Sequence, residues 1–451
     1  MESQDRKEIV ENLSYLIQVR DTAKLKNLIV DIHPADLADI LSEMEEQPRN
    51  YLFGLLESET ASNVMIELDE VTRNELVESM GLDRLSSIVV EMDSDDATDI
   101  LAELPKETAE QVLFRLDHEE RAEVEKLIVH EEDTAGGIMA LEFVTVQETD
   151  TVDEAIQKIR QKAQEVDEIY TVYVTDQARR LTGVLSLKKL LLSKHNMLIR
   201  DIMNRDVISV TAEKDQEDVA TIVRRYDLVS VPVVDHANRL VGRITIDDIV
   251  DVLQEEANED LSRMAGIDED EIPQEMSTFR ISRFRLPWLL IAFCGEVVSA
   301  FILKSFQASL EQIVATAFFI PLIMAMGGNS GIQASTIVVR SIAVEGSSDR
   351  WTRLWREMKV SLFNGLIMAL LVTLMVNVFF TDDPLFGLVI GVSMLIVMVN
   401  AAVTGTVVPY VLDKYDYDPA IATGPFITTS NDVFGLLIYL TLTMGYIRYF
   451  H

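Results

Sequence analysis

The first 130 residues alternate apolar and polar positions with the period of short amphipathic helices. In DLADILSEM, residues 36–44, the apolar side chains fall on one helical face, and the pattern returns as DATDILAEL at residues 96–104. Residues 68–80 resemble an intermediate unit. Each such unit needs neighbours to cover its apolar stripe, so residues 1–130 are predicted to form an α-helical superhelix.

The period changes at Gly136, where short β-branched runs begin to alternate with helical segments. Met139 aligns with Met203 and Gly183 with Gly242, which indicates two tandem β-α-β-β-α units at residues 136–199 and 200–254. The predicted strands and helices, in order, are residues 143–146, 152–163, 170–174, 181–185, 207–210, 217–226, 230–234 and 240–245.

An acidic segment, residues 246–275, connects these units to the apolar part of the chain. Its acids fall at helical spacings of three and four, and they include Asp247, Asp248, Asp251, Glu255, Glu256 and Glu259. Like charges one turn apart oppose a helix, so a helix here would gain stability from bound cations. The alternative is a solvated acidic linker.

Five apolar stretches follow, each long enough to cross a bilayer. They predict an all-α transmembrane domain of five helices at residues 280–451, with spans near 286–306, 313–338, 358–380, 385–411 and 421–447. The fifth span carries Asp432 near its middle. A carboxylate at that depth costs about 2.5–3.5 kcal/mol, so it should face the bundle interior or a wet cavity.

The partner of Asp432 is predicted to be a mobile cation or a proton, because no lysine or arginine lies in the middle of a span. The alternative is an acid hydrogen-bonded to a neighbouring helix. Glycines and polar side chains in the second and fifth spans favour an ion path, because they let helices approach closely or let the backbone open. Asn329 and Thr428 supply oxygens there, and Glu296 of the first span is a second acid.

The formal charge of −36 is concentrated outside the spans. Residues 1–140 carry −23 and residues 141–280 carry −12, whereas residues 281–451 carry only −1. Such a surface repels nucleic acid and attracts cations. The single cysteine, Cys294, excludes a disulfide framework within the chain, and the scattered histidines argue against a metalloprotease.

Basic residues set the expected orientation in the membrane. The start of the chain is polar and acidic and lacks the pattern of a signal peptide. Trp351 and Trp355 lie near a span end, as interfacial anchors do. The positive-inside rule therefore predicts a cytoplasmic N-terminus in a multi-pass protein of the cytoplasmic membrane. The basic residues that flank the spans on this side are Arg280, Arg283, Arg285, Arg340, Arg350, Arg353, Arg356 and Lys359.

The tandem units resemble a pair of CBS domains, most clearly in VPVVD at 231–235 and RLVGRITIDD at 239–248. The resemblance implies that the signature formed by Gly242, Thr245 and Asp248 can bind an adenosine nucleotide such as ATP. The first copy has Lys189 in place of the Asp, which implies one nucleotide site at most. The alternative is that Thr245 only caps the next helix.

The order of the parts, with the motifs PLIMAMGGNSGIQ and GPFITTSND, resembles the MgtE family of bacterial magnesium channels. The resemblance covers essentially the whole chain. It implies a homodimer with a pore on the two-fold axis and a magnesium ion held there by Asp432. In this interpretation carbonyls and hydroxyls around Thr428 bond the waters of hydrated Mg²⁺. Asn329 supplies a further oxygen to the ion path, and Asp418 concentrates cations near the mouth.

The same resemblance implies that cytosolic Mg²⁺ binds between the N-domain, the CBS pair and the connecting helix and closes the pore. The acids assigned to this regulatory role are Glu59, Glu91, Asp95, Asp227, Asp247, Asp248, Asp251, Glu255, Glu256 and Glu259. The competing class is a secondary transporter in which Asp432 relays a proton or Na⁺. A third class, a membrane enzyme such as an intramembrane metalloprotease, would need histidine ligands, and the predicted spans contain no histidine. No enzymatic activity is therefore expected.

Overall fold

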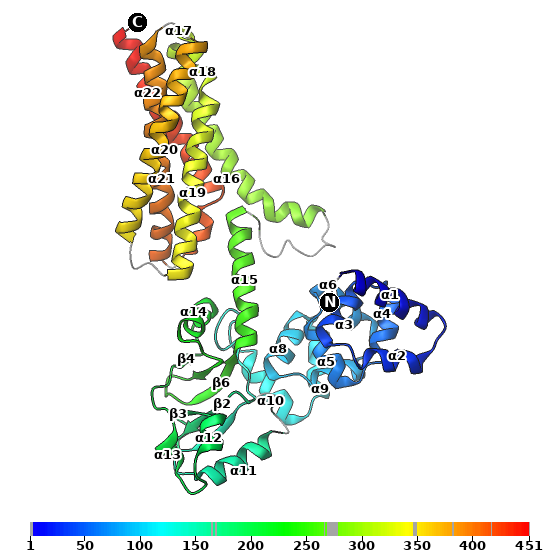
Figure 1. The fold of residues 1–451 in the computed structure, drawn as a ribbon. Helices are drawn as coiled ribbons and strands as arrows, with labels where there is room; N and C mark the ends of the chain where they lie inside the picture. Colours follow the sequence, from blue (N-terminus) through cyan, green and yellow to red (C-terminus); the bar gives the residue numbers. More distant parts are fainter. Residues whose placement is uncertain are drawn as a thin grey trace. The chain divides into compact units, whose positions relative to one another are not determined.

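The computed structural model describes residues 3–163, 166, 169–265, 267, 278–345, 350–380, 383–415 and 417–450. It divides into two compact units, residues 1–254 and 255–451, and each is described by itself (Figure 1). The first holds the helical N-domain and the α/β CBS pair, and the second holds the membrane helices. The predicted multidomain fold is confirmed.

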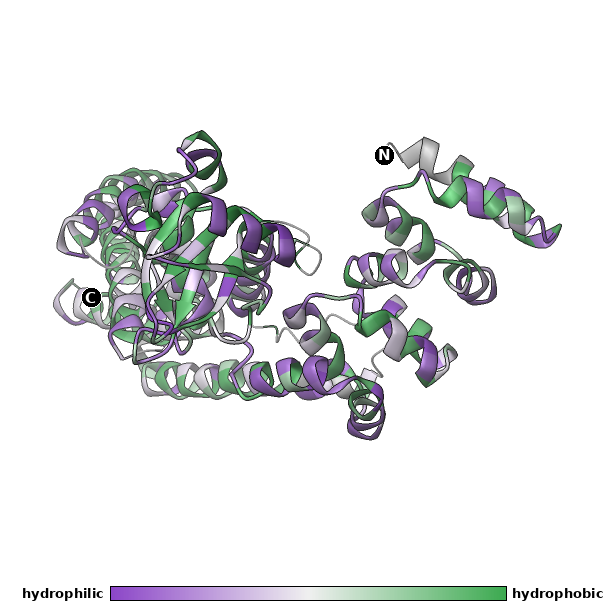
Figure 2. Ribbon diagram, turned by 90° about the horizontal axis from the view of Figure 1, so that it is seen from below, coloured by the Kyte–Doolittle hydropathy of each residue, from purple (hydrophilic) through white to green (hydrophobic). Residues whose placement is uncertain are grey.

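The N-domain is a superhelix of short helices. Helices α3, α5, α7 and α9 contact one another in succession, which is the stacking that the sequence repeat predicts. The apolar residues of both repeated segments are buried in one core, and Figure 2 shows the alternation of hydrophilic and hydrophobic residues along these helices. The bounds are α1 Ser3–Gln18, α2 Thr22–Ile29, α3 Pro34–Ser42, α4 Glu46–Phe53, α5 Ser58–Ile66, α6 Glu70–Ser79, α7 Leu82–Val89, α8 Ser94–Glu103, α9 Lys106–Arg115 and α10 His118–Leu127.

Some of the acids in this domain begin helices. The carboxylate of Asp69 accepts a hydrogen bond from the backbone N–H of Thr72 at 2.9 Å, and Asp117 forms a reciprocal capping box with Glu120. Such caps satisfy the free N–H groups of a first helical turn and contribute about 1 kcal/mol each. Part of the negative charge is therefore structural.

The CBS pair contains two three-stranded sheets, in the orders β1-β2-β3 and β4-β5-β6. In each sheet the middle strand pairs parallel with the first and antiparallel with the third. One prediction is partly wrong, because residues 207–209 lie outside β4, which pairs with β5 through two residues only. The bounds are β1 Val144–Gln147, α11 Val152–Lys162, β2 Thr171–Thr175, β3 Leu181–Ser186, α12 Leu187–Leu192, α13 Ile199–Ile202, β4 Val210–Thr211, α14 Gln216–Tyr226, β5 Ser230–Val234 and β6 Leu240–Thr245.

The segment before each sheet packs on the other sheet. Met139 is buried in the core of the second copy, and its sulfur lies 2.6 Å from the position of a Cβ built on Gly242. Met203 is buried in the core of the first copy and lies in the same way against Gly183. The residues that align between the two copies therefore form two reciprocal contacts, which hold the CBS pair together.

The connecting segment begins as one helix, α15 (Ile246–Ala265). Ile249 and Val252 are buried, while most of its acids are exposed or half-buried. The helical prediction is confirmed to Ala265, and residues 266 and 268–275 lie outside the described residues. Acids one turn apart along such a helix repel one another most strongly at low ionic strength.

Five helices of the second unit are long and apolar enough to cross a membrane, as predicted. Helix α21 contacts α19, α20 and α22 and is the most deeply packed span. The bounds are α16 Thr278–Ser305, α17 Gln307–Gln312, α18 Ala315–Phe318, α19 Ile320–Glu345, α20 Arg350–Phe379, α21 Pro384–Lys414, the 3₁₀ helix η2 Pro419–Ala422 and α22 Pro425–Phe450.

The glycines of the second span bring backbones together and do not open the helix. Helix α19 runs unbroken through Gly327 and Gly328. A Cβ built on Gly405 of α21 would lie 2.4 Å from the carbonyl oxygen of Gly331, so no larger residue fits this crossing without a shift. Of the two roles predicted for these glycines, the structure shows close packing.

Candidate functional site

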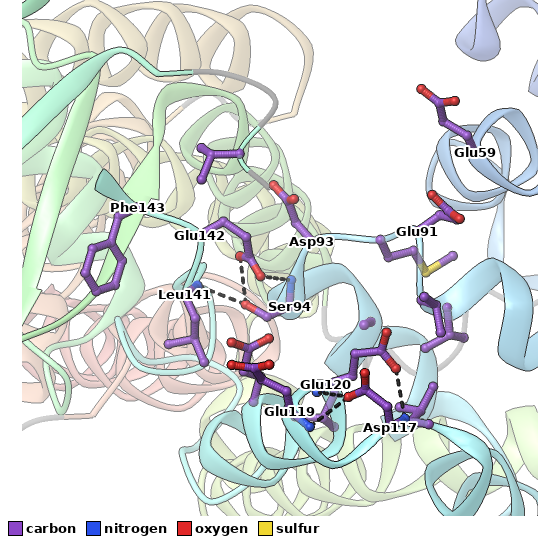
Figure 3. A pocket seen from close by; sticks show the side chains of 18 of the residues that line it. Glu59, Glu91, Asp93, Ser94, Asp117, Glu119, Glu120, Leu141, Glu142 and Phe143 are labelled. Atoms are coloured by element: carbon purple, nitrogen blue, oxygen red, sulfur yellow. Dashed lines mark hydrogen bonds between the residues drawn. The ribbon is translucent and has the colours of Figure 1, made fainter. Parts of the chain in front are cut away.

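The larger of two candidate sites is an acidic cavity in the first unit. It has a volume of about 730 Å³ and lies between the N-domain and the segment that precedes β1. Figure 3 shows carboxylates from several elements around it. Two of them, Glu59 and Glu91, belong to the predicted regulatory set. The other acids that line it are Asp93, Asp117, Glu119, Glu120, Glu123 and Glu142.

Glu142 links the CBS pair to the N-terminus of α8. Its carboxylate accepts hydrogen bonds from the backbone N–H and the hydroxyl of Ser94, at 3.2 and 2.9 Å. Carboxylate oxygens of Asp93, Asp95 and Glu142 all lie within 4.8 Å of one another. Three such oxygens can hold a hard divalent cation, which prefers oxygen ligands.

Asp95 and Asp96 are held in an environment that opposes their charge. Burial, followed by the charges of Asp96, Asp248 and Asp93, raises the pKa of Asp95 well above its usual value. Burial and the neighbouring Asp93 and Asp248 raise the pKa of Asp96 to about 7. Like charges placed together out of water keep a proton or require a counter-cation. A bound divalent cation would therefore remove an unfavourable interaction.

The acids at the start of α15 face this cluster within the first unit. The charge of Asp248 contributes to the raised pKa of both Asp95 and Asp96, and that of Asp247 to the raised pKa of Asp96. Burial and then Asp247 raise the pKa of Asp251. Asp95 and Asp248 are therefore close enough for their charges to interact, although they come from distant parts of the chain. The regulatory site itself stays a prediction.

The remaining predicted regulatory acids are dispersed. Asp227 is exposed and ends α14 in the left-handed conformation, with φ of 50°. Glu255 and Glu256 lie on α15 and belong to the second unit. Glu259 forms an ion pair with Arg263. None of these four lines the acidic cavity.

Sequence reasoning missed Glu142 and the acids at the start of α10. Glu142 directly precedes the strand predicted at residues 143–146, and this position gave no reason to place it beside an N-domain helix. Glu119 and Glu120 lie in the first turn of α10, where acids are expected as helix-stabilising charges. Because acids are common at helix starts, the sequence did not indicate that Glu119 and Glu120 line the same cavity.

The predicted nucleotide signature forms a helix cap. The backbone N–H and the hydroxyl of Thr245 donate to Oδ2 of Asp248, at 2.9 and 2.7 Å. In the first copy, the hydroxyl of Ser186 accepts from the backbone N–H of Lys189 at 3.3 Å. Both copies therefore cap the helix after the third strand, but only the second places a carboxylate there.

The second candidate site lies in the membrane unit around Asp432. This residue is half-buried on α22, one turn after the exposed Thr428. The Thr428 hydroxyl donates to the carbonyl of Gly424 at 3.4 Å, so its lone pairs stay available. Asn329 is exposed on α19, and no described contact joins it to Asp432.

Asp432 contacts a second acid from another span. Its carboxyl group forms a side-chain hydrogen bond with Glu296 of α16. The two helices approach closely at this level, because a Cβ built on Gly295 would lie 1.8 Å from Cγ2 of Thr429. Two carboxyl groups in contact share a proton or a cation. The contact with α16 matches the alternative stated for Asp432, an acid hydrogen-bonded to a neighbouring helix. It is also compatible with a shared proton or cation, so the predicted cation site stays a prediction.

Asn431, the neighbour of Asp432, links α22 to α19, the two helices in which the ion path is predicted. Its side-chain nitrogen donates to the carbonyl of Gly327 at 3.4 Å, and its Oδ1 is buried without a described partner. Asn329 was selected from sequence as the polar contribution of α19. The structure instead shows Asn431 joining α22 to α19.

Asp418 has a definite partner. One carboxylate oxygen accepts from the backbone N–H of Ala420 at 2.7 Å and begins η2. The other forms an ion pair with Arg263 of α15. Asp418 is therefore paired with a basic side chain of the same chain in this structure. Its predicted role of concentrating cations near the mouth stays a prediction.

Three family models match successive parts of the chain. A model described as "Divalent cation transporter" (MgtE) matches residues 320–442. The MgtE intracellular N domain matches residues 32–133, and the CBS domain matches residues 135–195 and 199–255.

Two curated relatives extend over almost the full length. The magnesium transporter MgtE of Thermus thermophilus is 37% identical, over 96% of this chain and 97% of its own. The magnesium transporter MgtE of Bacillus subtilis is 32% identical, over 98% of this chain and 100% of its own. A crystal structure of the cytosolic domain of the Mg²⁺ channel MgtE in complex with ATP is similar to this chain, with 36% identity and a TM-score of 0.52. The similar region covers 54% of this chain and 99% of the chain in that crystal structure.

These similarities agree with the five apolar helices and the acidic soluble unit. The protein is a multi-pass membrane protein whose N-domain and CBS pair are cytoplasmic. With each segment matched in the same order, and relatives at 32–37% identity over nearly all of its length, the chain belongs to the MgtE family.

Proposed function

We propose that the protein transports Mg²⁺ across the cytoplasmic membrane through a pore lined by Asp432. The observation that carries this proposal is the contact of two acids from two apolar spans, the half-buried Asp432 of α22 and the exposed Glu296 of α16. Mg²⁺ sheds its waters reluctantly and prefers octahedral oxygen. Carboxylates that hold a hydrated ion, with Thr428 bonded to its waters, meet both preferences.

The proposed pore lies on the two-fold axis of a homodimer. One Asp432 from each subunit would neutralise one Mg²⁺ without stripping all its waters. The name "Magnesium transporter" of the relatives supports the ion. The family is one of transporters, and we propose no enzymatic activity.

Cytosolic Mg²⁺ is proposed to act as a regulator at the acidic cluster of the first unit. The fit rests on the donor set, because three carboxylates lie within 4.8 Å and burial raises the pKa of Asp95 and Asp96. Bound Mg²⁺ would hold the N-domain against the CBS pair and the start of α15. By linkage, ions that bind the closed state better shift the channel towards it.

ATP is proposed as a second ligand of the CBS pair, at Thr245 and Asp248. The similar cytosolic domain was solved with ATP, which supports a nucleotide in this fold. Oδ2 of Asp248 is engaged by Thr245, so Oδ1 is the oxygen left to accept from ribose hydroxyls.

A coupled transporter is the second candidate function, and the same acid pair favours it. Two carboxyl groups in contact can pass a proton between them, which is how intramembrane relays work. In that case Mg²⁺ movement would require a proton or Na⁺ gradient. A channel would need only the gradient of Mg²⁺ itself.

The deciding experiment measures Mg²⁺ flux into liposomes with and without a proton gradient. Asp432→Ala and Asp432→Asn should reduce flux about 100-fold or more, since removing an ion ligand in a low-dielectric path costs several kcal/mol. Glu311→Gln, an exposed acid of α17, is the matched control and should retain parental flux. Near-parental flux in both Asp432 variants would reject the pore assignment, and flux only with a proton gradient would favour the coupled transporter.

A further inference from the structure

A cavity of the membrane unit lies where α19 ends and α20 begins. Its volume is about 290 Å³, and its polar lining consists of Arg340, Ser341, Arg353, Arg356 and Glu357. The N-terminal domains are cytoplasmic, so the first span leads out and the second, α19, leads back. The cavity is therefore at the cytoplasmic boundary of the membrane.

The lining of this cavity carries a net positive charge. Three guanidinium groups line it together with one carboxylate, that of Glu357, which is only 8% exposed. One carboxylate balances one guanidinium, so the lining residues together carry two positive charges in excess. Arginine presents a planar set of donors that matches phosphate oxygens in pairs. The chemistry therefore selects a phosphate-bearing anion.

The surroundings of the cavity select a lipid rather than a soluble anion. Ile337 lines the cavity and is 53% exposed, on the last two turns of a membrane span. Trp351 and Trp355, 75% and 57% exposed, lie on the turns of α20 that carry Arg353 and Arg356. Tryptophan at a membrane boundary lies at headgroup level. A ligand here contacts both arginines and a hydrocarbon-facing surface.

We propose that this cavity binds the phosphodiester headgroup of an anionic phospholipid of the cytoplasmic leaflet. Basic pockets between membrane helices on the cytoplasmic side suit such headgroups. A zwitterionic lipid carries the same phosphodiester, but its ammonium group is repelled by the arginines. The bound lipid would join the second and third spans, independently of the proposed magnesium path.

The test uses the full-length protein in nanodiscs of phosphatidylcholine mixed with phosphatidylglycerol, and native mass spectrometry counts the lipids that remain bound. Arg340→Gln with Arg356→Gln removes two exposed charges from the cavity. Arg283→Gln with Lys359→Gln removes two exposed charges near the same boundary, from residues outside the cavity lining. A third arm adds inorganic phosphate as the competing soluble anion.

The proposal expects the parent to retain phosphatidylglycerol over phosphatidylcholine, and the cavity variant to lose that preference by roughly 25-fold, since each of the two basic side chains contributes roughly fivefold. The control variant should stay within about twofold of the parent. Equal losses in both variants would overturn the proposal in favour of general surface charge. Displacement of the lipid by inorganic phosphate would overturn it in favour of a soluble-anion site, and so would a parent without preference.

Discussion

Arg263, near the end of α15, forms an ion pair with Asp418, which lies between α21 and α22. Arg263 also pairs with Glu259 on its own helix. Burial and then the charge of Asp418 raise the pKa of Asp260 to about 6. One arginine therefore pairs with two acids, Glu259 and Asp418, at the junction between the connecting helix and the segment leading to Asp432. Asp260 adds a further acid there.

This relationship predicts that Arg263 holds the end of α15 to the membrane helices in the closed conformation. Arg263→Gln should leave Asp418 facing Asp260 and Glu259 without a cation, and repulsion should separate them. We expect Mg²⁺ flux to persist at concentrations that close the parent, with the closing concentration raised roughly tenfold, since a hydrogen-bonded ion pair contributes about 1.5–3 kcal/mol. Flux into liposomes at graded internal Mg²⁺ measures this.

The matched control is Lys414→Gln, which removes an exposed cation from the end of α21 that contacts the Tyr415 ring and not Asp418. It should close at the parental concentration. If the Arg263 and Lys414 variants behave alike, the ion pair has no role in closure and serves only to stabilise the junction.

The second prediction concerns pH and follows from Asp96. Its pKa is about 7 in the folded protein and 3.8 without burial, so the folded state keeps a proton that the unfolded state releases. As pH rises from about 4 to about 7, the free energy of unfolding of the cytoplasmic unit should therefore fall. Each tenfold difference in proton affinity between the two states corresponds to about 1.4 kcal/mol. Mg²⁺ should cancel the fall by replacing the proton.

Urea unfolding of the protein followed by far-UV circular dichroism at about pH 5 and about pH 7.5, in EDTA and in saturating Mg²⁺, measures the effect. Asp96→Asn should reduce the pH dependence in EDTA, although Asp95 still contributes to it, whereas Glu107→Gln, an exposed acid of α9, should leave it unchanged. A parent whose stability is the same at both pH values in EDTA would contradict the buried acidic cluster.

Much of the fold follows from local patterns. The apolar stripe of residues 36–44 became the buried face of α3, and the alignment of Met139 with Met203 marked a true structural repeat. Periodicity reports which face of an element is buried. It does not report which element covers that face. The sequence therefore could not predict that Met139 packs on the sheet of the second copy and Met203 on the sheet of the first.

The sites were predictable only in part, for a related reason. Asp432 stood out because a carboxylate in an apolar span is costly. Glu142 had no such signal, since its meaning depends on Ser94, which lies 48 residues earlier in the chain. Asp418 was correctly placed between two spans, but its ion pair with Arg263, 155 residues away, depends on tertiary structure.

The third prediction separates the nucleotide and capping roles of the second CBS signature. Asp248→Ala should weaken ATP binding about tenfold or more, because it removes an acceptor for the ribose hydroxyls. Lys189→Ala should change it by less than about threefold, since that side chain carries no acceptor for a ribose. Calorimetric titration of the protein with ATP measures both variants. Equal effects, or no ATP binding by the parent, would leave Thr245 and Asp248 as caps, worth about 1 kcal/mol of stability.

The fourth prediction concerns the crossing of α19 and α21. Gly405→Ala should destabilise the membrane unit by about 1–3 kcal/mol, because the new methyl group overlaps the Gly331 carbonyl. Gly328→Ala is the matched control, since a Cβ built there meets no atom within 4 Å. Thermal unfolding in detergent should show a lower Tm for the Gly405 variant alone. A Gly405 variant as stable as the Gly328 variant would show that the crossing can adjust.

The last prediction concerns the cytoplasmic acids as a magnesium sensor. The acids at the start of α8 and at the start of α15 oppose each other's charge in the first unit, and bound Mg²⁺ would lower that repulsion. Neutralising acids of α14 and α15 should therefore leave the channel open at Mg²⁺ levels that close the parent, and deleting residues 1–130 should weaken closure too. The acids to neutralise are Asp227, Asp248, Asp251, Glu255, Glu256 and Glu259.

Protease protection of α15, measured against Mg²⁺ concentration alongside flux, tests this sensor directly. In the parent, protection and closure should rise together, since both report the Mg²⁺-bound conformation. A matched variant neutralises acids of the N-domain that lie outside the cavity, such as Asp83, whose side chain is almost fully exposed, and should keep the parental response. If protection does not depend on Mg²⁺ and the neutralised protein closes at the parental concentration, these carboxylates form only a solvated surface.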